Sequence, residues 1–239
     1  MSQQAYMGGE LELFAQASRW KEYWISQLRP YVQGAVLEVG AGIGANTLRL
    51  RSGSERRWVC LEPDPQLADT LRGQLTGTPL EWTTEVLTGT LETLEPAERF
   101  DSILYIDVLE HIEDDRGELE RAARHLAPGG HLIVLAPAHA WLFSEFDQAI
   151  GHFRRYTASG LSELTPAGVR LAKAFYLDSV GLLASAANRL VLRQSLPTAR
   201  QIHLWDRLMV PCSRLLDPFT GYRAGKSVVA VWERSSQGF

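Results

Sequence analysis

The chain has 239 residues, 45% of them hydrophobic and 22% charged, and a formal net charge of −4 at pH 7. This composition is typical of one globular domain with a well-buried core, and the two distant cysteines, Cys60 and Cys212, exclude a disulfide framework and a cysteine metal site. The sequence shows neither a signal peptide nor an apolar run of the about 20 residues needed to cross a bilayer, so we expect a single cytoplasmic domain over residues 1–239.

An N-terminal helix is predicted over about residues 11–28, because apolar side chains recur along one face, and Pro30 ends it. Strands are predicted at residues 36–39, 58–61, 80–84, 100–106, 131–136, 170–177 and 227–232. Further helices are predicted at residues 45–51, 65–75 and 115–126, from Thr157 or Ser159 to Pro166, and at 181–192 and 202–216. This alternation predicts an α/β fold with a doubly wound, mostly parallel seven-stranded sheet. The last two helices form an insertion at about 178–225, before the last strand.

The most informative stretch joins the first strand to a glycine turn at residues 36–46. Glycines let backbone N–H groups approach a bound ligand, and Gly40-x-Gly42-x-x-Ala45 fits a dinucleotide-binding turn. Glu62 lies twenty residues after Gly42 at a predicted strand end, where a carboxylate accepts both hydroxyls of a ribose. These features alone are equally typical of a nicotinamide-dependent oxidoreductase and of a methyltransferase.

Two observations favour the methyltransferase. Glu38 places a carboxylate at the mouth of the turn, which suits a methionyl ammonium and not a pyrophosphate. The chain also has no second half able to hold a nicotinamide and a substrate domain.

Beyond this turn, the chain resembles the class I S-adenosylmethionine (SAM)-dependent methyltransferases over residues 34–136. The matching motifs are Val-Leu-Glu-Val-Gly-Ala-Gly-Ile-Gly at 36–44, Leu-Glu-Pro-Asp at 61–64, Phe-Asp-Ser-Ile-Leu at 100–104, Asp-Val-Leu-Glu-His-Ile at 107–112 and Leu-Ala-Pro-Gly-Gly-His-Leu at 126–132. The resemblance implies a Rossmann-like fold, SAM as the cofactor and S-adenosylhomocysteine (SAH) as its product.

The resemblance also implies which residues bind the cofactor. The methionyl end would be held by Glu38, Gly40, Ala41, Gly42, Gly44, Asp107 and Val108, and the adenosine end by Glu62, Pro63, Asp64, Thr90 and Leu91. Many relatives carry an aspartate that contacts the adenine amine at the place of Thr90, so this chain departs from the pattern there.

Candidate acceptor-side residues follow the predicted strands at 100–106 and 131–136. His111 is a candidate base or hydrogen-bond donor, and the alternative is a first-turn histidine bonded to backbone. The segment 137–156 ends in Gly-His-x-Arg-Arg-Tyr and resembles a bacterial, type 11-like methyltransferase subgroup with small-molecule or cell-envelope-type acceptors.

In that segment His152 and Tyr156 are candidate catalytic residues, and His139, Arg154 and Arg155 are candidate substrate contacts. The alternative is a loop tied to the body by ion pairs between Asp147 and the arginines, with Tyr156 packed on the core.

The first helix adds Tyr23 and Trp24 as candidate lid and substrate contacts, although Trp24 also fits simple packing onto the sheet. No metal site is predicted, because the histidines lack ligand spacing in the sequence.

Possible partners are suggested by the C-terminal part of the chain. Residues 189–223 hold six arginines against two aspartates, without the dense Lys and aromatic pattern of a nucleic-acid-binding face. The predicted helix at 202–216 has an apolar face that fits core packing, a homodimer or a peripheral membrane contact.

The sequence thus predicts a SAM-dependent methyltransferase that modifies an O, N or C atom of a small-molecule or lipid/glycan-type acceptor. A catalytically silent SAM- or SAH-binding partner subunit and a nicotinamide-dependent oxidoreductase remain as alternatives.

Overall fold

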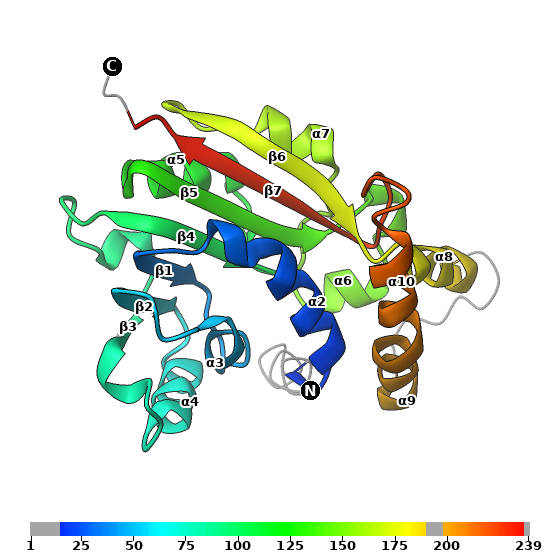
Figure 1. Cartoon of the computed structure of the whole chain (residues 1–239), viewed down its shortest axis with the longest axis horizontal. Helices are drawn as coiled ribbons and strands as arrows, with labels where there is room; N and C mark the ends of the chain where they lie inside the picture. The colour runs from blue at the N-terminus through cyan, green and yellow to red at the C-terminus, as the bar shows by residue number, and fades with distance from the viewer. Residues whose placement is uncertain (1–14, 190–197, 237–239) are drawn as a thin grey trace.

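The computed structural model describes residues 15–189 and 198–236, without the side chain of Trp82, and shows a twisted seven-stranded sheet with helices on both faces (Figure 1). The strand order is β3-β2-β1-β4-β5-β7-β6. Strand β7 runs antiparallel to β5 and β6, and every other neighbouring pair is parallel. The predicted doubly wound, mostly parallel α/β sheet is therefore confirmed.

The strands are β1 (Ala35–Val39), β2 (Arg57–Glu62), β3 (Thr84–Thr88), β4 (Phe100–Ile106), β5 (Leu126–Pro137), β6 (Val169–Leu177) and β7 (Ser227–Arg234). Every residue of β1 is buried, as expected for a central strand covered on both faces. Strand β3 was predicted at 80–84 but begins only at Thr84, where it pairs with Trp58. The residues before it form a helical turn at Glu81–Thr83, and the Thr84 hydroxyl closes that turn by donating to the Leu80 carbonyl oxygen (2.8 Å).

The helices are α2 (Ser18–Leu28), α3 (Thr47–Leu50), α4 (Pro65–Leu75), α5 (Asp115–Arg124), α6 (Glu145–Ala149), α7 (Ala158–Glu163), α8 (Ser179–Ala187), α9 (Ala199–Leu204) and α10 (Val210–Leu216). Short helical turns lie at Arg29–Tyr31, Leu91–Thr93, Leu109–His111 and Ala140–Leu142. Among the described residues, no helix is both long and apolar enough to span a bilayer.

Several helix boundaries differ from the prediction. Helix α2 begins at Ser18, and residues 11–14 of the predicted helix lie outside the described residues, as do residues 190–192 of the helix predicted at 181–192. The helix predicted at 202–216 is a continuous run from α9 to α10, widened into a π-helical turn at Trp205–Met209. Pro211 follows this turn and lacks the backbone N–H that a regular helix would use there.

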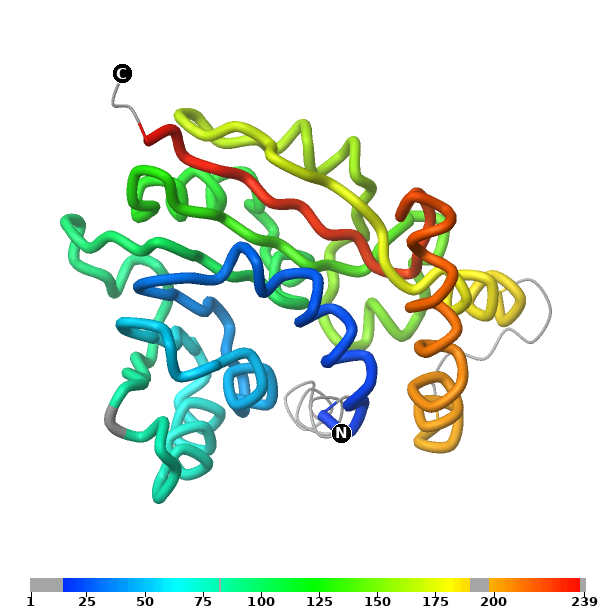
Figure 2. Tube along the Cα trace, viewed as in Figure 1, coloured from blue at the N-terminus to red at the C-terminus, as the bar shows by residue number. Residues whose placement is uncertain are grey.

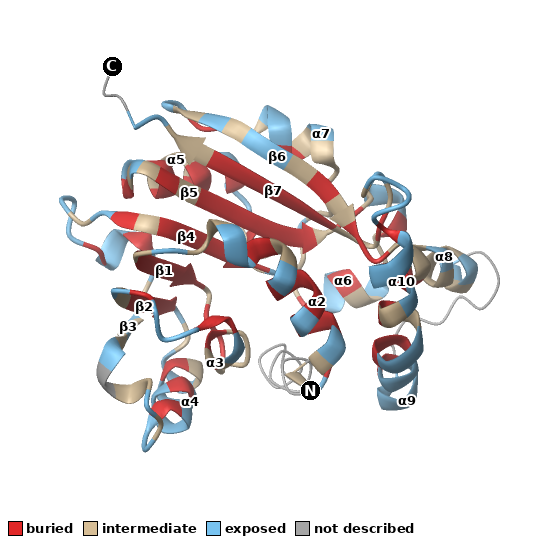
Figure 3. Cartoon of the chain, viewed as in Figure 1, coloured by how far each residue is buried: buried red, intermediate tan, exposed pale blue. Residues whose placement is uncertain are grey.

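Two hydrophobic cores lie on the two faces of the sheet, and strands β1, β2, β4, β5 and β7 are buried along most of their length (Figure 3). Helices α2, α3 and α4 cover one face together with the insertion, and α5 and α7 cover the other. Strand β7 lies between β5 and β6 in the chain trace (Figure 2), so the insertion between β6 and β7 stands at one end of the sheet.

Two buried aspartates fasten the insertion. Asp178 accepts hydrogen bonds from Trp205 Nε1 (2.7 Å) and Ser213 Oγ (2.6 Å), which joins α8 to the α9–α10 run. Asp217 accepts from the Tyr23 hydroxyl (2.7 Å) and from the Asp178 backbone N–H (2.8 Å), which joins α2 to the end of β6. These contacts hold the insertion against α2 and the end of β6.

Candidate functional site

The glycine turn leaves the carboxyl end of β1 and packs closely against its neighbours. Gly40 has a φ of 67°, and a Cβ there would lie 2.7 Å from Val108 Cγ2. Gly44 has a φ of 82°, and a Cβ there would lie 2.2 Å from Leu71 Cδ1. Because side chains rarely adopt this φ and have no room here, only glycine fits both positions. The Leu61 carbonyl oxygen accepts the N–H groups of Gly40 and Ala41, which holds the turn against β2.

Glu38 lies beneath the turn and not at its mouth as expected, with 2% of its surface exposed. Its Oε2 accepts hydrogen bonds from Thr47 Oγ1 (2.7 Å) and Trp58 Nε1 (3.0 Å). Burial raises the pKa of Glu38 to about 7, although these hydrogen bonds and the charge of Lys21 oppose the rise. The Glu38 carboxylate is therefore bound by protein groups and is not exposed at the surface of the turn.

The predicted adenosine-binding residues gather at the carboxyl ends of β2 and β3. Glu62 ends β2, and its carboxylate accepts the backbone N–H groups of Gly42 (2.7 Å) and Asp64 (3.0 Å). Asp64 caps α4 by accepting the N–H groups of Gln66 and Leu67. The Gly89 N–H donates to the Glu62 carbonyl oxygen, which places Thr90 and the buried Leu91 next to this strand end. Pro63 lies between the two acids.

A cavity of about 1030 Å³ opens beside the turn. Of the predicted site residues, it is lined by Trp24, Gly40, Ala41, Gly42, Asp107, His111, His152 and Arg155. The cavity is also lined by four residues that the sequence did not predict: Lys21 and Asn46 near the turn, and Lys226 and Trp205 farther along. The ammonium of Lys226 lies 4.7 Å from the centroid of the Trp205 ring.

Lys21 and Asp107 form an opposite-charge pair beside the glycine turn. Lys21 is buried on α2 and donates to Asn46 Oδ1, and burial lowers its pKa to about 8. Asp107 directly follows β4 and has a φ of 55°. Its surface is accessible through the cavity, yet the surrounding protein raises the pKa of its carboxyl by desolvation, against the opposing charge of Lys21. The charges of Lys21 and Asp107 thus attract each other, and both residues line the cavity.

Asp147 is fully buried and holds several residues of the segment 137–156 together. Its carboxylate accepts hydrogen bonds from Arg155 Nε (2.8 Å) and Nη2 (3.0 Å), from His152 Nδ1 (3.0 Å) and from Ser144. The hydrogen bonds from His152 and Arg155 hold the pKa of Asp147 well below its usual range, against the effect of burial. This matches the expected Asp147–arginine contact, while leaving Arg155 and His152 in the cavity wall.

The two predicted catalytic histidines meet in that wall. The His111 and His152 rings lie edge to face with 4.5 Å between their centroids. Burial lowers the pKa of His111 to about 4, with a further lowering from the nearby His152. The fold thus brings two histidines that are far apart in the sequence into contact in the wall of the same cavity.

Four other predicted residues are engaged elsewhere and are not among those lining the cavity. The Tyr23 hydroxyl donates to Asp217, and the Tyr156 hydroxyl donates to Asp115 Oδ2 (2.9 Å) and the Leu109 carbonyl oxygen. Arg154 pairs with Asp115 (2.7 Å). His139 Nε2 bonds the Gly225 carbonyl oxygen (3.0 Å), and its ring stacks on Tyr176. These contacts tie the loop and α2 to the protein body.

Comparison with known proteins places the match in the first part of the sheet. Residues 37–134 match a family model described as a methyltransferase domain. A ubiquinone biosynthesis O-methyltransferase of Bradyrhizobium sp. (strain ORS 278) is 40% identical over 52 residues, which span 22% of this chain and 21% of that protein. The chain thus spans about a fifth of that curated relative.

Solved structures share the fold over most of the chain. A putative sarcosine dimethylglycine methyltransferase from Galdieria sulphuraria has a TM-score of 0.61 at 18% identity, with 90% of this chain and 84% of that chain covered. A coclaurine N-methyltransferase bound to N-methylheliamine and SAH has a TM-score of 0.57 at 18% identity, with 83% and 66% covered. The chain thus contains a segment that matches a methyltransferase-domain model, and it shares the fold of these solved structures.

Proposed function

We propose that the protein transfers a methyl group from SAM to an O, N or C atom of a small-molecule or lipid/glycan-type acceptor and releases SAH. The observation that carries this proposal is the pairing of Lys21 with Asp107 beside the glycine turn. A free amino-acid end carries one ammonium and one carboxylate, and this pair offers a partner of opposite charge to each. A pyrophosphate would gain from Lys21 but would be repelled by Asp107.

The residues present fit the whole cofactor. Asp107, Val108 and the backbone of the turn from Gly40 to Gly44 would hold the methionyl end together with Lys21, above the negative charge of Glu38. Glu62 would bind the ribose hydroxyls, with Pro63, Asp64, Thr90 and Leu91 around the adenine. The absence of a side chain at Gly40 lets the turn pack closely against Val108, one of the residues proposed to hold the methionyl end.

SAM, when bound, supplies a methyl group on a positively charged sulfur. The chain's own contribution is to hold the acceptor atom in line with that methyl group and to exclude water. His111, His152 and Arg155 line the cavity wall beyond Asp107 and are proposed to contact the acceptor. Trp24, on α2, also lines the cavity.

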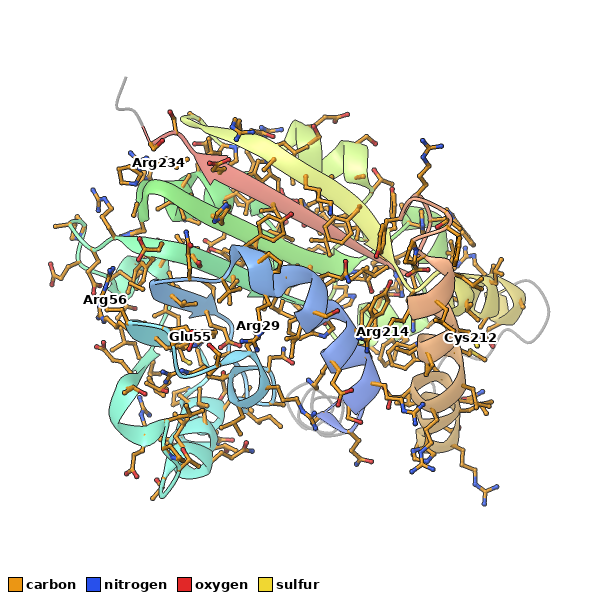
Figure 4. All side chains as sticks on the ribbon, viewed as in Figure 1. Arg29, Glu55, Arg56, Cys212, Arg214 and Arg234 are labelled. Carbon is orange, nitrogen blue, oxygen red and sulfur yellow. The ribbon has the colours of Figure 1, made fainter. Side chains whose placement is uncertain are left out.

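An exposed apolar row beside the cavity favours a lipid-type acceptor. Leu204 lines the cavity, and Leu208 and Leu215 follow it in the same helical run with 59% and 70% of their surfaces exposed. Phe219, which is 88% exposed, lies in the turn after α10. Two exposed arginines belong to the same helical run: Arg207, and Arg214 on α10, which is labelled in Figure 4. Arginines next to exposed leucines suit the surface of an anionic membrane, from which such an acceptor would be taken.

Calorimetry with SAM, SAH and NAD tests the proposed function. We expect binding in the micromolar range for SAM and SAH only, because Lys21 and Asp107 offer partners for both charges of an amino-acid end, whereas Asp107 would repel a pyrophosphate. Transfer of labelled methyl from SAM to the lipid fraction of a cell extract then separates an active enzyme from a catalytically silent subunit. Binding of NAD without binding of SAH would overturn the assignment.

The affinity for SAM is expected to be highest between about pH 7 and pH 8. Glu38, with its pKa raised to about 7, loses its negative charge below that pH, and Lys21, with its pKa lowered to about 8, loses its positive charge above that pH. Affinity should therefore fall on both sides, by up to about tenfold per pH unit. Calorimetry from pH 6 to 9 measures this profile.

The variant Glu38→Gln provides the control for this profile. The amide keeps the size of the side chain but has no charge to lose, so the acid side of the profile should flatten. An affinity that stays constant from pH 6 to 9 in the unmodified protein would contradict the roles given to Glu38 and Lys21.

A further inference from the structure

Three side chains of metal-binding type meet in the cavity wall beyond Asp107. One ligand atom from each of Glu110, His111 and His152 lies within 4.8 Å of the others. His152 Nε2 is 3.8 Å from Glu110 Oε1, and all three residues line the cavity. We propose that this cluster binds one divalent transition-metal ion such as Zn²⁺.

The orientation of both rings supports this site. His152 Nδ1 bonds Asp147, whose carboxylate also receives two donors from Arg155, so the hydrogen of this contact belongs to the imidazole. In the neutral ring, Nε2 then carries a lone pair and faces Glu110 Oε1, which is also an acceptor. The His111 ring bonds the backbone of Gly151. Histidines that bind metals typically have the other ring nitrogen fixed by a carboxylate or a backbone oxygen in this way.

The ligand types indicate which ions fit. Two imidazoles and one carboxylate suit Zn²⁺ and Fe²⁺, whereas Mg²⁺ and Ca²⁺ prefer sites made of oxygen ligands. Three protein ligands leave at least one coordination position open, which is typical of catalytic and not of structural metal sites. Because all three residues line the cavity proposed to hold the acceptor, an open position would be accessible from that cavity.

This placement gives the ion a role that rests on the proposed function. An acceptor hydroxyl bound to the ion would release its proton to solvent at a lower pH than in water. The oxygen lone pair then forms the new O–C bond while the C–S bond breaks, and the electron pair of that bond stays on sulfur. The site therefore favours an oxygen atom as the methyl acceptor.

The competing arrangement needs no metal. A protonated His152 would donate from Nδ1 to Asp147 and hold an ion pair with Glu110, as a purely structural contact. The two arrangements differ in a measurable way, because only the first gives the protein a tight, stoichiometric affinity for Zn²⁺ or Co²⁺.

The test is titration of chelator-treated protein with Zn²⁺ by calorimetry and with Co²⁺ by visible absorption. We expect about one ion per chain, and affinity at least about tenfold weaker in His152→Gln and in Glu110→Gln. His139→Gln is the matched control, because His139 belongs to the same segment but bonds Gly225 outside the cluster. Circular dichroism of each variant verifies folding.

Binding by the unmodified protein that is no tighter than binding by both cluster variants would overturn the metal site. SAM binding is measured on the same metal-free protein, which separates the two proposals. Normal SAM binding without metal binding would leave the proposed function standing and remove only the metal. Metal binding without SAM binding would do the reverse.

Discussion

Replacing Asp107 with asparagine is expected to weaken SAM binding roughly 30- to 1,000-fold and to leave the protein folded. The loss corresponds to about 2–4 kcal/mol, the usual effect of removing one partner from a charge pair that is shielded from water, here Asp107 and the ammonium of bound SAM. Asparagine is the suitable replacement because Asp107 has a φ of 55°, a conformation that asparagine tolerates better than most residues. Calorimetry with SAM measures the change.

Two further measurements test whether Asp107→Asn acts specifically on the methionyl end: the thermal stability of the variant and its affinity for a second ligand. Because desolvation raises the pKa of Asp107, its charge is unfavourable in the free protein, and the variant should unfold at an unchanged or higher temperature. The nucleoside 5′-methylthioadenosine lacks the amino-acid end, so its affinity should be the same for both proteins. Asp69→Asn removes the same charge from the exposed surface of α4 and serves as the control. Equal losses for SAM and for the nucleoside would contradict a contact between Asp107 and the methionyl end.

The order of strands and helices could be predicted because each central strand is a short apolar run bounded by turn residues. Both faces are buried in β1, β2, β4 and β5 except near the strand ends, so exposed polar residues do not interrupt the apolar run. The edge strand β3 shows the limit. Its burial alternates weakly, and its start is set by pairing with β2, which local sequence does not encode.

The grouping of residues around the glycine turn could be predicted in part because they follow one another closely after β1, β2 and β4. Lys21 was missed because it looks like an ordinary polar residue of an amphipathic helix. Its position at the turn depends on how α2 packs across the sheet, which places it against Asn46. Lys226 was missed for a similar reason, because its neighbour Trp205 comes from the insertion.

The cluster of Glu110, His111 and His152 illustrates the same limit on the acceptor side. Neither spacing in the sequence nor a motif joins residues 110–111 to residue 152. The turn after β4 and the loop after β5 meet because the Phe153 N–H donates to the Glu110 carbonyl oxygen (2.8 Å). Tertiary packing, and not local pattern, brings the three side chains together.

Replacing Asp217 with alanine is expected to lower the free energy of unfolding by about 3–5 kcal/mol. Asp217 is fully buried and accepts hydrogen bonds from the Tyr23 hydroxyl, from the Asp178 N–H and from Ser179. Without the carboxylate these buried donors lose their acceptor, and each unsatisfied group costs about 1–3 kcal/mol. For a chain of this size the midpoint of thermal unfolding should fall by about 6–20 °C. Calorimetric or spectroscopic melting measures it.

Tyr23→Phe separates this structural role from the lid role that the sequence suggested for Tyr23. The variant removes one donor and leaves Asp217 its other partners, so we expect a loss of about 1–2 kcal/mol in stability and an unchanged affinity for SAM in the folded protein. In Asp217→Ala the tyrosine hydroxyl has already lost its partner, so Tyr23→Phe should cost less stability there than in the unmodified protein. A SAM affinity that falls while stability holds would instead place Tyr23 in the binding site. The geometry predicts the opposite, because the hydroxyl is directed into the contact that joins α2 to the insertion.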